Sequence, residues 1–269
     1  MSDIGDDWSL YAAHRERLTS ALLECATPDG GRLCILGAGK CNDVDLERLA
    51  ERFSEIHLVD IDAPALASAV ARQSPAVRAR LRPHVPVDLS GMSSKRLSKW
   101  QRKPPTRAEL EAFEAATLAS IASRLPGPFE VVASACILTQ LSFSLRHGLG
   151  ERHPMLAALR LSVMTTHLRV LLALAQPGGR CLFASDVVSS TSYPLDAAAG
   201  ERDLLEVVRD IEASGASYFS ADPKRIRGAL LYTELADLAT EPVELRPWLW
   251  TGPLARTYLV YALRFTKRA

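Results

Sequence analysis

The sequence predicts an α/β fold with a doubly wound, mostly parallel sheet and an antiparallel hairpin at its C-terminal edge. Three observations lead to this prediction. Short apolar runs alternate with amphipathic, helix-like segments along the chain, a pattern typical of strand–helix–strand units. Turns rich in proline and glycine separate these segments. The chain has 269 residues and no internal repeat, which suits one large domain.

The N-terminal half predicts a succession of helix and strand. An amphipathic helix is expected over residues 9–25, because leucines recur on one face, and a Pro-Asp-Gly-Gly turn at 28–31 ends it. A buried strand over 32–36 leads into a Gly-Ala-Gly turn and a helix over 43–53. We then expect a strand over 55–61, a helix over 64–72 and a third strand over 85–89.

Residues 91–107 interrupt this rhythm. The segment concentrates lysine and arginine around Trp100 and ends in two prolines, so we interpret it as a loop or basic insertion, either a solvated lid or a grip for an acidic partner. Its position after the third strand suits a lid over a ligand. Its basic residues are Lys95, Arg96, Lys99, Arg102, Lys103 and Arg107.

The C-terminal half continues the alternation. A helix over 107–125 and a Pro-Gly-Pro turn precede a strand over 129–133, and a long helix over 154–175 precedes a Pro-Gly-Gly turn and a strand over 180–185. Helical segments are expected over 201–213 and 224–238. The closing segments 244–250 and 257–265 predict the antiparallel edge hairpin.

Composition excludes several classes of protein. Lysine plus arginine total 32 and aspartate plus glutamate 31, a balance that argues against a nucleic-acid partner. The five cysteines form no C-x-x-C pair, as expected of reduced thiols in a cytoplasmic protein. The N-terminus lacks the pattern of a secretory signal, and we expect no stretch with the apolar length of a membrane span.

Three predicted strand ends carry residues that point to a ligand. Gly37 and Gly39 follow the first strand, where a ligand can lie against backbone without bulky side chains and near the free N–H groups of a helix start. Asp60 ends the second strand, 23 residues after Gly37, where a carboxylate can accept both hydroxyls of a ribose. Asp88 lies in the third strand and could accept a hydrogen bond from an adenine amine. Because open α/β sheets bind ligands at the carboxyl ends of their strands, we expect one common cleft.

With these residues in place, the chain resembles the class I S-adenosylmethionine-dependent methyltransferases, which have a Rossmann-like fold. The resemblance covers roughly residues 32–186 in order, and the strand over 257–265 fits the family's last strand. It implies a single class I methyltransferase-like domain over 1–269, with an N-terminal helix within 1–30 and the segment 91–107 as an insertion or lid. The runs that carry it are ILGAGKCND (35–43), HLVDID (57–62), PVDLSG (86–91), FEVVASACILTQLS (129–142) and PGGRCLFASD (177–186).

The resemblance implies S-adenosyl-L-methionine as the cofactor. In this family the glycine turn contacts the amino-acid part of the cofactor, the acid after the second strand holds the ribose, and the third-strand acid contacts adenine. Residues after the fourth strand line the methionyl end. The cofactor-binding residues so implied are Gly37, Ala38, Gly39, Asp60, Ile61, Asp88, Leu89, Ser134 and Cys136.

Two residues depart from the family's pattern. Ile35 stands where the family often has an acid, and Cys41 stands where it often has a third glycine. Asn42 or Asp43 could contact the ammonium of the cofactor instead.

No motif specifies the methyl acceptor. Methyl transfer from a sulfonium is an in-line displacement that positioning and desolvation can drive, so no universal catalytic residue exists. The segment 134–137 lacks the D/N-P-P-Y sequence of enzymes that methylate nucleobases or glutamine, and an acid needed for a metal site is missing there, so we predict no metal. A small molecule or peptide remains as substrate. His147 is a candidate general base, or else a surface histidine, and Trp8, Tyr11 and Tyr193 are candidate substrate contacts.

Other functions stay open. A P-loop is excluded, because Gly39-Lys40 has cysteine at both Cys34 and Cys41 where the motif needs glycine and Ser or Thr. An NAD-dependent oxidoreductase could use Asp60 equally well, although the third glycine of its motif would fall at Asn42. A catalytically silent cofactor-binding module and an RNA methyltransferase are further alternatives. The oligomeric state is not indicated.

Overall fold

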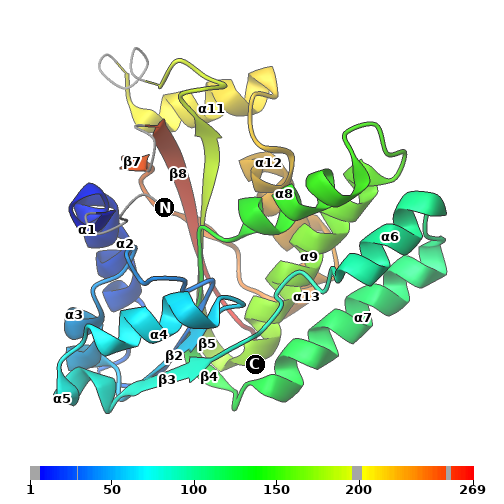
Figure 1. Ribbon diagram of the computed structural model, residues 1–269. Coiled ribbons are helices and arrows are strands. Elements are labelled where there is room, and N and C mark those ends of the chain that lie inside the picture. Colours follow the sequence, from blue (N-terminus) through cyan, green and yellow to red (C-terminus); the bar gives the residue numbers. More distant parts are fainter. Residues whose placement is uncertain (1–6, 29, 196–201, 253–255) are drawn as a thin grey trace.

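The computed structural model describes residues 7–28, 30–195, 202–252 and 256–269 (Figure 1). In this part of the chain, one sheet has the strand order β3-β2-β1-β4-β5-β8-β6, and β7 also pairs with β8. The pairs from β3 to β5 are parallel, whereas β8 runs antiparallel to β5, β6 and β7. The predicted fold class is therefore confirmed. The strands are β1 (Arg32–Leu36), β2 (Glu55–Val59), β3 (Leu81–His84), β4 (Phe129–Ala135), β5 (Ala175–Ser189), β6 (Val243–Glu244), β7 (Trp248–Gly252) and β8 (Arg256–Thr266).

Helices cover both faces of the sheet because the buried strands present apolar side chains to both sides. Along β1, Leu33 and Ile35 pack into one core cluster, and Cys34 and Leu36 pack into the other. The first face is covered by α1 (Asp7–Leu10), α2 (Ala12–Glu24), α3 (Leu46–Arg52), α4 (Ala63–Ala71) and α5 (Pro75–Arg78). The second carries α6 (Ser94–Arg102), α7 (Arg107–Arg124), α8 (Leu138–Leu149), α9 (Leu156–Leu174), α11 (Leu204–Ser214), η1 (Phe219–Ala221), α12 (Pro223–Tyr232) and α13 (Leu235–Leu238).

Side-chain caps fix where several helices begin. Asp45 accepts hydrogen bonds from the Glu47 and Arg48 N–H groups at the start of α3. Asp62 accepts one from the Ala65 N–H at the start of α4. Both helices therefore start directly after the turns that follow β1 and β2.

The third strand differs from the prediction. It spans Leu81–His84 rather than residues 85–89. His84 pairs with Val59, the last residue of β2, so the chain beyond His84 has no neighbouring strand, and Pro86 has no N–H to pair. Residues 85–89 form the connection that follows β3.

Among the described helices of eight or more residues, two were not predicted. The first is α6 within the basic segment, where Trp100 is 3% exposed and packs edge-on against Phe113 of α7. The second is α8, which follows β4. The segment 91–107 is thus largely a helix packed on α7 and α8 rather than a loop.

Helix α9 is long and apolar enough to cross a membrane by length and composition, contrary to the expectation that no stretch reaches that length. It packs against α7, α8 and the strands β4 and β5, and most of it is buried inside the protein. These contacts make it a central core helix.

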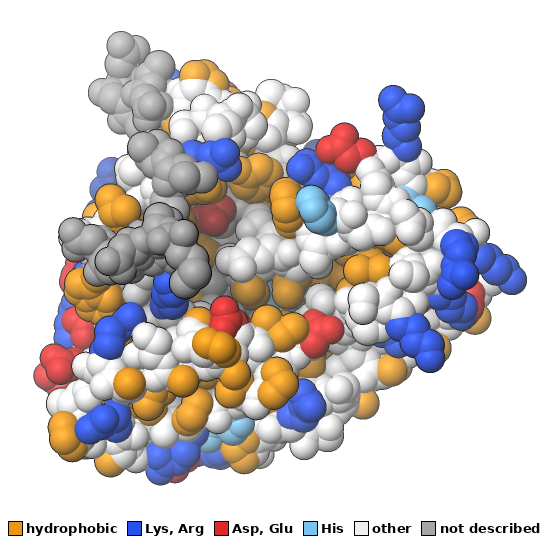
Figure 2. Space-filling view, in the orientation of Figure 1, with side chains coloured by type: hydrophobic (Ala, Val, Ile, Leu, Met, Phe, Trp, Pro, Cys, Tyr) orange, Lys and Arg blue, Asp and Glu red, His pale blue; other side chains and the backbone are white. Residues whose placement is uncertain are grey.

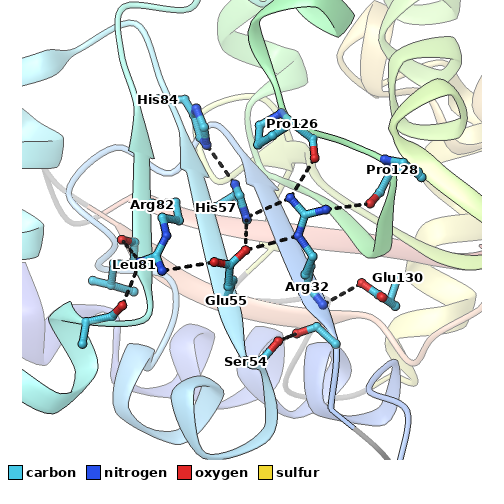
Figure 3. Close-up of polar contacts among 12 residues, drawn as sticks. Arg32, Ser54, Glu55, His57, Leu81, Arg82, His84, Pro126, Pro128 and Glu130 are labelled. Carbon is cyan, nitrogen blue, oxygen red and sulfur yellow. Dashed lines mark hydrogen bonds and ion pairs between the residues drawn. The ribbon is translucent and has the colours of Figure 1, made fainter.

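A polar cluster spans β1, β2 and β3 on the face that α7 and α9 cover (Figure 3). The ring nitrogens of His57 and His84 lie 2.9 Å apart, and Glu55 lies within 3.2 Å of both His57 and Arg32. Arg82 pairs with the other oxygen of Glu55 at 3.1 Å. The cluster ties together the three strands whose carboxyl ends form the candidate site.

Candidate functional site

The turn after β1 requires glycine. Gly37 has φ +79°, and a Cβ there would lie 2.5 Å from Cβ of Ile137, the residue that begins the turn from β4 into α8. Its N–H donates to the Val59 carbonyl at 2.9 Å, as does that of Ala38 at 3.1 Å. The backbone ends of β1, β2 and β4 therefore meet at one point.

Asp60 closes this turn. Its Oδ2 accepts a hydrogen bond from the Gly39 N–H at 2.7 Å, and its Oδ1 accepts one from the Asp62 N–H at 2.9 Å. The Asp60 side chain is mostly buried, whereas the neighbouring Ile61 is 62% exposed at the border of the site. Each carboxylate oxygen can accept a second hydrogen bond, so Asp60 retains acceptor capacity for a ligand.

Asp88 lies in the connection that follows β3, next to the end of β2. The Val87 N–H donates to the Asp60 carbonyl at 2.9 Å, which brings residues 87–89 next to the end of β2. The Asp88 Oδ1 accepts from the N–H and hydroxyl of Ser90 and from the Gly91 N–H. Asp88 lines a hollow of about 340 Å³ bordered by α7, and Leu89 is buried in the core.

The two residues predicted at the end of β4 have different surroundings. Ser134 is fully buried, and its hydroxyl lies 2.8 Å from Nε2 of His167 on α9, within the core. Cys136 is buried at the strand end with φ +49°, a backbone conformation unusual for a side-chain-bearing residue. Burial and nearby Asp186 raise the pKa of the Cys136 thiol.

Two carboxyl groups, the half-buried Asp43 and the buried Asp186, lie close enough to interact. Burial raises the pKa of Asp43 to about 7, with a further contribution from Asp186, and burial raises that of Asp186 to about 6. The Trp250 indole N–H donates to Asp186 Oδ1 at 2.9 Å. Negative charge concentrated in a poorly solvated position favours a cationic ligand there.

His14 on α2 packs beside Asp43. Its Nδ1 accepts the Trp248 indole N–H at 2.9 Å, which leaves the proton on Nε2, 3.9 Å from Asp43 Oδ1. Burial lowers the pKa of His14 to about 4, so the ring is neutral at pH 7. In the described part of the chain, His14 Nε2 is buried without a hydrogen-bond partner.

A cavity of about 1300 Å³ adjoins this acidic pair. Asp186 and Ser189 of β5, Trp250 of β7, and side chains of α8 and the segment before η1 line it. The space-filling view shows a hollow near the middle of the molecule, with apolar side chains around it (Figure 2). The cavity has room for a drug-sized molecule.

The candidate general base His147 and the candidate substrate contact Tyr11 both line this cavity. The Tyr11 ring packs 4.8 Å from that of Trp250, and the exposed His147 stacks on Phe143 in the last turn of α8. Trp8 is instead 44% exposed with the Arg15 guanidinium 3.5 Å above its ring. Tyr193 packs against the core cluster of α9.

Sequence reasoning gave no ligand role to Asp186, Trp250 or Arg160, which all line the cavity. The signal available was the alternation of Trp248 and Trp250, which places both indoles on one face of a strand. That face carries the two indole N–H groups to His14 and Asp186.

No family model matches the chain, and no curated protein matches it significantly. Solved structures do match. The YcgJ protein from Bacillus subtilis is 9% identical with a TM-score of 0.51, over 94% of this chain and 99% of that one. The N-methyltransferase NodS from Bradyrhizobium japonicum WM9, solved with S-adenosyl-L-homocysteine, is 13% identical with a TM-score of 0.45, over 99% and 94%.

The amino pentose methyltransferase CalS10 from Micromonospora echinaspora is 19% identical with a TM-score of 0.33, and the match covers 66% of this chain and 51% of that one. The chain thus spans about half of CalS10. At these identities the likeness to YcgJ, which extends over nearly the whole of both chains, establishes the fold and no more.

Proposed function

We propose that this chain, which has the fold of the class I methyltransferases, transfers a methyl group from S-adenosyl-L-methionine to a small molecule. The observation that carries the proposal is the hydrogen bond from the Gly39 N–H to Asp60. It joins the glycine turn and the acidic strand end at 2.7 Å, and the exposed Ile61 lies next to them in the chain. A cavity of about 1300 Å³ opens at the end of β5 and beside α8.

The residues at this position fit the proposed cofactor. Asp60 would accept hydrogen bonds from the ribose hydroxyls. The protein backbone of the turn 37–39 would lie against the ligand, and the exposed Ile61 would face the adenosyl group. Asp43 and Asp186 supply poorly solvated negative charge that the ammonium of the cofactor would neutralise. They would thereby replace the acid that the family often has at the position of Ile35. When bound, the cofactor supplies an electrophilic methyl group on a sulfonium.

This chain's own residues would position and desolvate the acceptor. Three aromatic rings lie in a row along the cavity wall: Trp250 stacks on Tyr258 with ring centroids 5.1 Å apart, and the tilted ring of Tyr11 packs 4.8 Å from Trp250. Aromatic faces favour a cationic centre and exclude water. His147, on the opposite helix α8, is proposed to accept a proton from an acidic acceptor group. We also propose the cytoplasm as the compartment, since all five cysteines are free.

Calorimetry with S-adenosyl-L-homocysteine tests the cofactor part of the proposal. We expect binding in the micromolar range with one site per chain, and no detectable heat at millimolar ligand would overturn it. A parallel titration with NADH should give no binding. Binding of NADH in preference to S-adenosyl-L-homocysteine would favour the oxidoreductase alternative.

Transfer of a labelled methyl group to components of a small-molecule cell extract tests the enzymatic part. A labelled product that depends on the protein and on Asp60 is expected. If the protein binds S-adenosyl-L-homocysteine tightly but labels nothing in small-molecule, peptide and RNA fractions, it is a binding module of this fold.

A further inference from the structure

Positively charged side chains outnumber negatively charged ones among the described residues that line the large cavity. Arg146, Arg160 and Arg256 line it, whereas Asp186 is its one carboxylate among the described lining residues. The cavity is therefore biased toward positive potential and toward an anionic occupant.

Arg160 is the most informative of these arginines. It lies in the first turns of α9 and lines the cavity, where its guanidinium packs 5.9 Å from the ring centroid of Phe219. Its Nε is buried and has no hydrogen-bond partner in the described part of the chain. A buried N–H donor on a charged group is costly when it is left unpaired, so this geometry calls for an acceptor supplied by a ligand.

Arg146 places a second positive charge in the same part of the wall. It lies in the last turn of α8, close enough to Arg160 for their like charges to repel, and its guanidinium stacks over Phe143 at 4.9 Å. Glu151 pairs with Arg146 at 3.4 Å and lies close enough to attract Arg160 as well, but it does not line the cavity. Two arginines held near each other at a cavity surface are a typical binding site for a planar or tetrahedral oxyanion. We call Arg146 and Arg160 the oxyanion seat.

The remaining residues of the cavity wall indicate the chemistry of the rest of the ligand. Six aromatic side chains line it, and hydroxyl groups lie between them. Ser142 on α8 and Ser220 on η1 are buried and hydrogen-bond to each other across the wall. Such a surface suits an apolar or aromatic molecule with a few polar substituents. The aromatic residues are Tyr11, Phe143, Tyr218, Phe219, Trp250 and Tyr258.

We propose that the methyl acceptor is a small molecule with an oxyanionic group, a carboxylate or a phosphate, that is held by Arg160 and Arg146 at the α8–α9 end of the cavity. Its apolar body lies along the aromatic wall, and its methylated atom lies toward Asp186 and Trp250. This assignment of substrate class rests on the proposed function, because it takes the cavity to be the acceptor site.

A matched set of probes tests the oxyanion seat on the full chain. The probes are 4-phenylbutyrate, 3-phenylpropyl phosphate, 4-phenylbutan-1-ol and 4-phenylbutylamine, titrated by ligand-observed NMR with and without saturating S-adenosyl-L-homocysteine. We expect at least one of the two anions to bind about tenfold or more tightly than the alcohol, and the amine to bind most weakly. The two anionic arms distinguish a carboxylate seat from a phosphate seat.

Substitutions test whether Arg160 is responsible for the preference for anionic probes. Arg160→Gln should reduce affinity for the preferred anion about tenfold and leave the alcohol unchanged, and Arg160→Lys should retain part of the preference because it keeps the charge. Arg209→Gln, an exposed site on α11, is the matched control and should change neither. Equal binding of all four probes, or an anion preference that survives in folded Arg160→Gln and Arg160→Lys alike, overturns the proposal. Loss of S-adenosyl-L-homocysteine binding with an intact anion preference would instead refute the proposed function alone.

Discussion

At the scale of single residues, three carboxyl groups organise the site in different ways. Asp60 is held by two backbone N–H groups and orders the turn that it borders. Asp43 and Asp186 lack comparable backbone partners in the described structure, and burial raises the pKa of both. Asp60 is therefore built as a fixed hydrogen-bond acceptor, whereas the other two are poised to gain from a positive charge.

Replacing Asp60 with asparagine tests its role. The amide cannot accept from both backbone N–H groups, because one of its two terminal groups is itself a donor. We expect Asp60→Asn to weaken S-adenosyl-L-homocysteine binding at least tenfold in calorimetry. Glu51→Gln on the exposed side of α3 removes a charge elsewhere and should leave the affinity unchanged. Unchanged affinity in a folded Asp60→Asn protein would contradict the role given to this side chain.

The acidic pair predicts a pH dependence of ligand binding. An ammonium favours the ionised forms of Asp43 and Asp186, whose pKa values are raised to about 7 and 6, so binding should release protons. Affinity for S-adenosyl-L-homocysteine should therefore rise from pH 5.5 to pH 8. Asp43→Asn should flatten this profile, and Asp237→Asn on exposed α13 should not. A profile that is flat in the unaltered protein would contradict the assignment.

The same pair predicts the pH dependence of the ligand-free protein's stability. Both pKa values are raised above the ordinary value of 3.8, so the folded chain holds protons that the unfolded chain has already released. The contribution of the pair to stability is complete at pH values below about 4 and is lost as the pH rises through about 6 to 7. Denaturant unfolding should show Asp43→Asn gaining stability relative to the unaltered protein between pH 5 and pH 8. An equal difference at both pH values would contradict this account.

At the scale of elements, the site depends on how closely the end of β1 approaches the turn after β4. A Cβ at Gly37 would collide with Ile137, and φ +79° adds strain. Gly215 follows α11 with φ +67°, and an added Cβ there would have no atom within 4 Å. A substitution at Gly215 therefore measures the backbone strain without a collision.

Gly37→Ala should therefore lower stability and cofactor affinity together, whereas Gly215→Ala should cost only about 1 to 2 kcal/mol of stability and leave affinity intact. Denaturant unfolding and calorimetry measure the two effects. A Gly37→Ala protein as stable as Gly215→Ala, with normal affinity, would show that the close approach does not matter.

Much of this element arrangement could be predicted from the sequence. The parallel core is visible because each strand is a continuous apolar run between turns, and Gly37 and Asp60 stand out because their residue types suit strand ends. The bounds of β3 could not be predicted, because they depend on where β2 ends, which is a pairing between distant segments. Helix α6 was obscured by its charge, since only Leu97 and Trp100 mark its inner face.

Asp43 stood out in the sequence as a candidate contact for the ammonium of the cofactor, but its pairing with Asp186 and the oxyanion seat could not be predicted. Asp43 and Asp186 are far apart in sequence, and their raised pKa values come from burial, to which Asp186 adds in the case of Asp43. Arg146 and Arg160 lie on separate helices, and their residue types are ordinary for a helix surface. Such sites arise from tertiary packing, which the periodicity of a single segment does not report.

At the scale of the whole molecule, two regions meet along the carboxyl ends of the parallel strands. One is the cradle of Gly37, Gly39 and Asp60 beside α3 and α4, and the other is the large cavity beside α8 and η1. Asp186 borders the cavity and interacts with Asp43, which follows the cradle in the chain, so the acidic pair lies where the two regions join. This arrangement would bring a donor and an acceptor together at one boundary.

The most direct test is a crystal structure of the protein with S-adenosyl-L-homocysteine. We predict that the ribose hydroxyls lie on Asp60, that the ligand ammonium lies beside Asp43 and Asp186, and that the sulfur atom faces the cavity lined by Trp250. A ligand bound elsewhere, or one whose sulfur is walled off from that cavity, would contradict the account.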